Sequence, residues 1–140
     1  DFILIDCPPS LNILTLNALV AAHSVLIPVQ CEYYALEGLS GLDDTIRRIQ
    51  SGINSNLMIE GLLRTMFDSR NSLTNEVSDQ LRDHYGKLLY NTFIPRNVRL
   101  AEAPSFGKSV IDYDPLCSGS LAYISLASEI LGIDQSDGDN

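Results

Sequence analysis

Short apolar runs alternate with segments of helical period along this chain. The runs at residues 2–5, 24–29, 58–66 and 88–94 predict strands. Apolar residues three or four positions apart predict helices over residues 10–21, 39–53, 73–81 and 123–130. Prolines and glycines between residues 95 and 115 predict a long loop.

The strand–helix order, repeated four times, predicts an α/β fold with a parallel, doubly wound sheet and helices on both faces. The first strand, residues 2–5, is apolar throughout and is expected to be buried on both faces. Such a strand at the start of a chain without an initiator Met suggests a piece of a longer protein. Residues 1–133 are expected to form one domain portion, and residues 134–140 an acidic disordered tail.

Composition excludes several classes of protein. A chain of 140 residues that is 45% hydrophobic is long and apolar enough for a core, which excludes disorder. The formal net charge of -9 argues against a surface that binds nucleic acid everywhere, so any DNA contact must be local. Three widely spaced cysteines fit neither a disulfide framework nor a zinc ribbon and favour a reducing cytoplasm. No apolar run is long enough to span a bilayer.

Ligands of doubly wound sheets bind beyond the carboxyl ends of the strands. Asp6 directly follows the first apolar run, where a carboxylate can hold hydrated Mg²⁺ beside a phosphate. An Asp that only begins a turn before Pro8-Pro9 is an equally good interpretation of this feature alone.

Four segments, in this order, closely resemble the ParA/Soj family of chromosome- and plasmid-partition ATPases: DFILIDCPPS (1–10), LTLNAL (14–19), PVQCEYYALEG (28–38) and IPRNVRLAEAPS (94–105). The resemblance runs from residue 1 to about 131 and implies a P-loop NTPase-type sheet with its N-terminal part missing. The family's Gly-rich Walker A loop lies upstream, and no G-x-x-x-x-G-K-[ST] occurs here. The parent protein is therefore expected to be an ATPase and this segment alone to be inactive.

The resemblance implies ATP and Mg²⁺ as cofactors. Asp6 is the expected catalytic carboxylate, which positions the metal through water. The residues expected around the adenine base are Pro95, Arg96 and Asn97, with Thr65 and Met66 at the neighbouring strand end. Taken without the resemblance, a strand terminator is the favoured interpretation of Pro95, because proline commonly ends strands.

DNA contact and dimerisation are also implied by the resemblance. Arg70 and Arg99 match arginines that hold DNA without sequence preference, and guanidinium groups suit phosphate oxygens. Ion pairs with Asp68 or Glu102 are the alternative for these arginines. Glu32, Tyr33 and Glu37 are expected at a dimer interface, although the tyrosine could equally be an amphipathic packing residue.

As a whole, the resemblance implies an ATPase for chromosome or plasmid partitioning. It would form an ATP-dependent homodimer, bind nonspecific DNA, respond to a centromere-binding ParB-like partner, and be cytoplasmic and nucleoid-associated. A MinD-like cell-division ATPase is one alternative, but the tail at residues 134–140 is acidic and lacks the basic amphipathic character that membrane binding needs. A non-catalytic interaction module is the other alternative.

Overall fold

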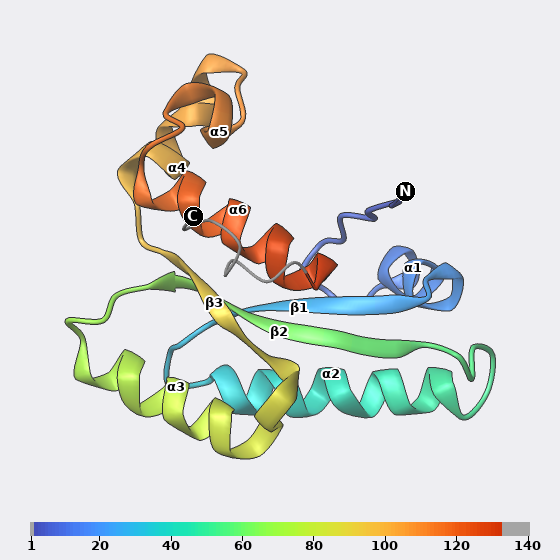
Figure 1. Cartoon of the computed structure of the whole chain (residues 1–140). Helices are drawn as coiled ribbons and strands as arrows, with labels where there is room; N and C mark the ends of the chain where they lie inside the picture. Colours follow the sequence, from blue (N-terminus) through green and yellow to red (C-terminus); the bar gives the residue numbers. More distant parts are fainter. Residues whose placement is uncertain (1, 133–140) are drawn as a thin grey trace.

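Three parallel strands form a single sheet in the computed structural model, which describes residues 2–132 (Figure 1). In sheet order these are β1 (Ser24–Gln30), β2 (Met58–Phe67) and β3 (Leu89–Pro95). Both neighbouring pairs run parallel, which confirms the predicted α/β fold with a parallel sheet.

Helices cover both faces of the sheet. The longer ones are α1 (Ile13–Ala21), α2 (Ala35–Gln50), α3 (Ser72–Tyr85) and α6 (Ser118–Leu131), and a short 3-10 turn (Gly86–Leu88) precedes β3. Figure 1 shows α2 and α3 on one face and α6 on the other. Consecutive residues of β2 point to opposite faces of the sheet. Leu62 packs in the larger core cluster, and Leu63 packs with Leu126 of α6 on the other face.

The predicted first strand at residues 2–5 is wrong, because these residues are irregular and exposed. Ile3 and Leu4 are 92% and 91% exposed. An apolar run predicts that a segment can be buried, but a parallel strand forms only beside another strand that supplies its hydrogen bonds. Within residues 2–132, no strand pairs with this segment.

The predicted loop at residues 95–115 is also wrong, since it contains three short helical segments: α4 (Val98–Glu102), a 3-10 turn (Ala103–Phe106) and α5 (Val110–Tyr113). The sequence features that favour these helices are capping residues at their ends, not a hydrophobic periodicity. The side chain of Asn97 caps α4, the side chain of Ser109 caps α5, and Gly107 ends the 3-10 turn with a φ of +63°. Figure 1 shows α4 and α5 extending away from the sheet.

Two further predictions concern the cysteines and the tail. Cys7, Cys31 and Cys117 are free thiols; Cys31 is buried, whereas Cys7 is exposed. The predicted acidic tail at residues 134–140 lies outside the described residues. Within the described part of the chain, no helix combines the length and apolar character needed to cross a bilayer.

Candidate functional site

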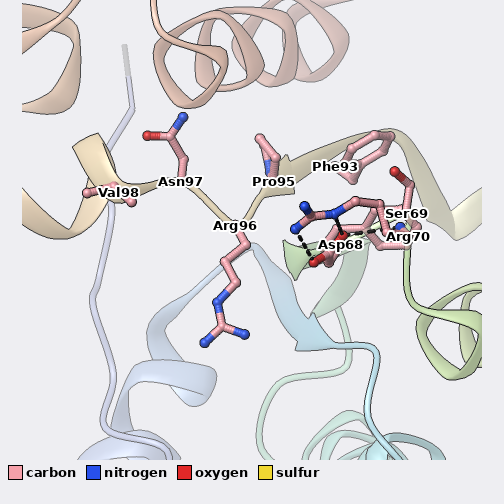
Figure 2. A pocket seen from close by; sticks show the side chains of 9 residues that line it. Asp68, Ser69, Arg70, Phe93, Pro95, Arg96, Asn97 and Val98 are labelled. Atoms are coloured by element: carbon pink, nitrogen blue, oxygen red, sulfur yellow. Dashed lines mark hydrogen bonds and ion pairs between the residues drawn. The ribbon is translucent and has the colours of Figure 1, made fainter.

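An open depression of about 440 Å³ lies where β2 and β3 end. It is lined by Phe67, Asp68, Ser69, Arg70, Phe93, Pro95, Arg96, Asn97 and Val98, most of which Figure 2 labels. Four predicted site residues, from two separate parts of the sequence, therefore meet in one place. The position agrees with the expectation that ligands of parallel sheets bind at the carboxyl edge.

Strand pairing brings the two walls of the pocket together. Phe67 of β2 is the register partner of Pro95 in β3, and the backbone N–H of Arg96 donates to the Phe67 carbonyl at 3.0 Å. The rings of Phe67 and Phe93 lie with centroids 4.6 Å apart. These contacts give the pocket an apolar wall of two aromatic rings and a proline, a surface suited to a flat, weakly polar group.

The three residues of the predicted base loop have different surroundings. The Asn97 side chain accepts hydrogen bonds from the N–H groups of Arg99 (2.8 Å) and Leu100, and its Nδ2 donates to Ser118 at 2.7 Å. Both the oxygen and the nitrogen of the Asn97 side-chain amide thus make hydrogen bonds within the protein. Arg96 is exposed, and within residues 2–132 its side chain makes no hydrogen bond or ion pair. In Figure 2, Asn97 points toward the helix above the loop, and Arg96 points away from it on the other side.

Thr65 and Met66 lie on β2 just before the pocket and do not line it. The Thr65 hydroxyl donates to the Val29 carbonyl at 3.4 Å, so it binds β1 rather than facing a ligand. Met66 has a φ of +51°, in the left-handed region that residues other than glycine rarely adopt. This backbone turn precedes Phe67, and the strand pairing is irregular between Arg64 and Phe67.

Arg70 forms a two-pronged ion pair with Asp68 on the pocket wall. Its Nε and Nη2 donate to the two carboxylate oxygens at 2.9 and 2.8 Å (Figure 2). Hydrogen bonds from the side chain and backbone of Arg70 lower the pKa of Asp68 to about 2. The Arg70 side chain is still 88% exposed, so it remains within reach of an external anion.

Arg99 lies on α4 and outside the pocket. Its Nη1 lies 2.9 Å from Glu102, and its Nε lies 3.4 Å from Asp114. Each of the two predicted DNA arginines therefore makes the ion pair that the sequence left open as an alternative. Both also keep at least half of their side-chain surface exposed.

Asp6 is exposed in the irregular segment before α1 and does not line the pocket. The structure therefore does not place it at the end of a strand, because residues 2–5 form none. Within residues 2–132, no three His, Cys, Asp or Glu side chains gather as a metal site. A single exposed carboxylate does fit Mg²⁺, which keeps several waters and takes its remaining ligands from substrate phosphates.

Glu32, Tyr33 and Glu37 lie between the end of β1 and the first turn of α2, and all three are exposed. Tyr33 is 76% exposed and contacts Tyr34 edge to face, with ring centroids 5.0 Å apart. Glu37 lies in the first turn of α2, where the helix dipole favours a negative charge. The tyrosine is thus not a core packing residue, and the three side chains are available for an intermolecular contact.

Sequence reasoning missed Arg64, a buried cation next to the pocket. Arg64 is 4% exposed, and its guanidinium lies 5.6 Å and 5.5 Å from the ring centroids of Phe67 and Phe93. Burial lowers the pKa of Arg64 from its usual value, yet an arginine stays charged. The available signal was one arginine inside the apolar run of β2, a position where a charge needs specific partners.

Several known proteins with similar sequences carry related names. The family model described as "AAA domain" matches residues 1–59. The chain is 53% identical over 130 residues to the chromosome partitioning protein ParA of Caulobacter vibrioides, covering 93% of this chain and 49% of that protein. It is 55% identical over 130 residues to the sporulation initiation inhibitor protein Soj of Bacillus subtilis (93% and 51%), and 54% identical over 134 residues to the chromosome-partitioning ATPase Soj of Treponema pallidum (96% and 53%).

Solved structures share the fold. A cobyrinic acid a,c-diamide synthase from Mycobacterium smegmatis, with bound ADP and magnesium, is 34% identical with a TM-score of 0.71, covering 90% of this chain and 44% of that one. The cell division ATPase MinD of Pyrococcus furiosus has a TM-score of 0.75 at 22% identity, covering 96% and 53%. The curated sequence matches confirm the resemblance drawn from the motifs: the chain belongs to the ParA/Soj family and spans about half the length of the curated relatives it matches.

Proposed function

We propose that this chain is the part of a chromosome- or plasmid-partition ATPase that receives the nucleotide base. The observation that carries the proposal is the pocket at the ends of β2 and β3, whose walls join the Pro95–Asn97 loop to two aromatic rings. Its apolar surface suits a purine, and backbone groups of the loop can supply hydrogen bonds. Similarity to a protein named a chromosome-partitioning ATPase supports the same assignment.

The rest of the nucleotide site needs residues beyond this pocket. ATP phosphates are usually held by a Gly-rich loop and a lysine, and this sequence has no such motif. Asp6 would hold Mg²⁺ through water, and the metal would neutralise charge on the phosphates. The chain's own contribution is therefore to bind and orient the base and to provide one carboxylate. We expect this chain alone to neither bind ATP tightly nor hydrolyse it.

Val98→Asp in the protein encoded by the complete reading frame tests the pocket. Val98 lines the pocket, is 71% exposed, and occupies the first position of α4, where an aspartate favours the helix. A carboxylate there would repel the nucleotide, and we expect the Kd for Mg-ATP to rise about tenfold or more in calorimetric titration.

The matched control is Leu116→Asp, which adds the same charge at an 82% exposed site outside the pocket. Its Kd should stay at the wild-type value. Equal affinity in the two variants would refute base binding at this pocket. Wild-type protein that binds no ATP would instead favour the non-catalytic interaction module.

We further propose that Arg70 and Arg99 contact DNA phosphates in an ATP-dependent homodimer, with Glu32, Tyr33 and Glu37 at the dimer contact and a centromere-binding ParB-like protein as stimulating partner. The exposure of both arginines supports this role. Their ion pairs imply that DNA phosphates must compete with Asp68, Glu102 and Asp114. Because the chain's net charge is -9, two copies are needed to present a strong local positive patch.

Asp68→Asn tests the competition directly. Removing the carboxylate frees the Arg70 guanidinium, and DNA retention by the ATP-bound protein should increase severalfold at moderate salt. Asp44→Asn is the matched control, since it removes one negative charge from an exposed position on α2 outside the pocket. Arg70→Glu and Arg99→Glu should abolish retention, and Arg99→Glu, which lies outside the pocket, should leave ATP binding intact. Retention that rises equally in both asparagine variants, or survives both charge reversals, would exclude these arginines as the DNA contacts.

A further inference from the structure

Two charges of opposite sign hold the two ends of the same peptide groups in β3. Arg64 Nη2 donates to the carbonyl oxygens of Tyr90 and Asn91, each at 2.9 Å. On the other side, the N–H groups of Asn91 and Thr92 donate to the Glu129 carboxylate at 2.7 and 2.9 Å. These four groups belong to two consecutive peptide units, so each peptide dipole lies between a guanidinium and a carboxylate and is aligned with the field between them.

This arrangement replaces regular strand geometry at that point. In an extended strand, successive N–H groups point in opposite directions, whereas here two in a row point to Glu129. The strand register shows the same irregularity. Leu62 pairs with Leu89 and Arg64 pairs with Phe93, so two residues along β2 correspond to four residues along β3. The charged pair therefore satisfies the backbone groups of a bulge that the neighbouring strand cannot satisfy.

The bulge is joined to the pocket by direct contacts. Phe93, which lines the pocket, follows Thr92 immediately, and the Arg64 guanidinium lies against the rings of Phe93 and Phe67. Ser78 of α3 receives a third hydrogen bond from Arg64, at 3.0 Å, which fixes the guanidinium against that helix. Arg64 and Glu129 do not line the pocket themselves, so any effect they have on a ligand must act through this wall.

We propose that Arg64 and Glu129 are positioning residues that set the selectivity of the pocket among purine bases. The inference rests on the proposed function, in which this pocket takes the base of ATP. Discrimination between an amino and an oxo group on a purine depends on backbone donors and acceptors held within about 0.5 Å of the right place. The charged pair fixes the chain three residues before the Pro95–Asn97 loop. In the proposed function, the phosphates are bound by residues outside this pocket.

Glu129→Gln in the protein encoded by the complete reading frame tests the proposal. A glutamine oxygen can accept one N–H bond, but its NH₂ group cannot accept the second, so the bulge loses one anchor. We expect the ratio of the Kd values for Mg-GTP and Mg-ATP to fall roughly tenfold, with the affinity for inorganic tripolyphosphate unchanged. A purely structural role would not move this ratio in a folded protein.

Arg64→Lys is the second variant, because lysine keeps the positive charge and the apolar stem but cannot make three directed bonds. Glu76→Gln and Arg48→Lys are the matched controls at exposed helix positions. A ratio within about twofold of wild type in either folded variant overturns the proposal, as does failure of both variants to fold, which would make the pair a general stability element. Absence of ATP binding by the wild type overturns the proposed function together with this inference, whereas an unchanged ratio in an ATP-binding protein overturns this inference alone.

Discussion

Single side chains at the pocket carry charges that the fold has already paired. Asp68 is the clearest case, because both its oxygens accept from Arg70 while part of the carboxylate stays exposed. The residue types alone do not show that the charges of Asp68 and Arg70 are paired with each other. Sequence reasoning assigned Arg70 a DNA contact and noted Asp68 as its possible partner, and the geometry shows that the two roles compete for the same guanidinium.

The Asp68–Arg70 pair predicts a measurable titration. Asp68 should titrate with a pKa of about 2, and Arg70→Ala should raise that pKa toward the ordinary value near 4. Because the folded-state pKa is depressed, the pair stabilises the fold above the ordinary pKa, and that contribution is lost as the pH falls through about 2. Carboxyl carbon NMR measures the pKa directly.

Arg48→Ala is the control for this titration, since Arg48 is an exposed cation on α2 outside the pocket. It should leave the Asp68 pKa in place. An Asp68 pKa near 4 in the wild type would show that the ion pair does not persist in solution.

The strands and helices differ in how well hydrophobic pattern predicts them. The predicted strands at residues 24–29, 58–66 and 88–94 lie within one residue of β1, β2 and β3 at each end. Residues 2–5 have an equally apolar pattern, yet they form no strand, because pattern does not report whether a partner strand is present. Residues 95–115 contain short helices that the hydrophobic pattern does not predict. Their caps, Asn97 and Ser109, indicate a helix less strongly than the surrounding prolines indicate a loop.

Because Met66 has a left-handed backbone conformation, we expect valine substitutions at the two methionines of β2 to change the free energy of unfolding unequally. Met66→Val should lower the free energy of unfolding by about 1–2 kcal/mol, because a β-branched side chain resists a positive φ. Met58→Val should change it by less than about 0.5 kcal/mol, since Met58 is an exposed residue at the start of the same strand. Urea unfolding of both variants compares them. Equal losses would indicate that residue 66 has ordinary strand geometry in solution.

At the level of the whole molecule, the chain brings a pocket at the ends of β2 and β3, two exposed arginines and one exposed carboxylate, Asp6, onto an α/β framework. The motifs predicted most of the pocket's loop, because Pro95, Arg96 and Asn97 are adjacent in sequence. They could not predict Phe67, Phe93 and Arg64, which meet only through strand pairing and a bulge. They also placed Asp6 at a strand end that the described residues do not form.

The most direct measurement is Mg²⁺-dependent ATP turnover by the protein encoded by the complete reading frame, with wild type and Asp6→Ala compared in parallel. We predict turnover by the wild type and a loss of at least about a hundredfold in the variant, because Asp6 would hold the Mg²⁺ ion that supplies charge stabilisation at the phosphates. Base binding at the pocket should persist in the variant. Equal turnover by the two proteins would contradict the proposed role of Asp6, and no turnover by the wild type would contradict the proposed ATPase activity.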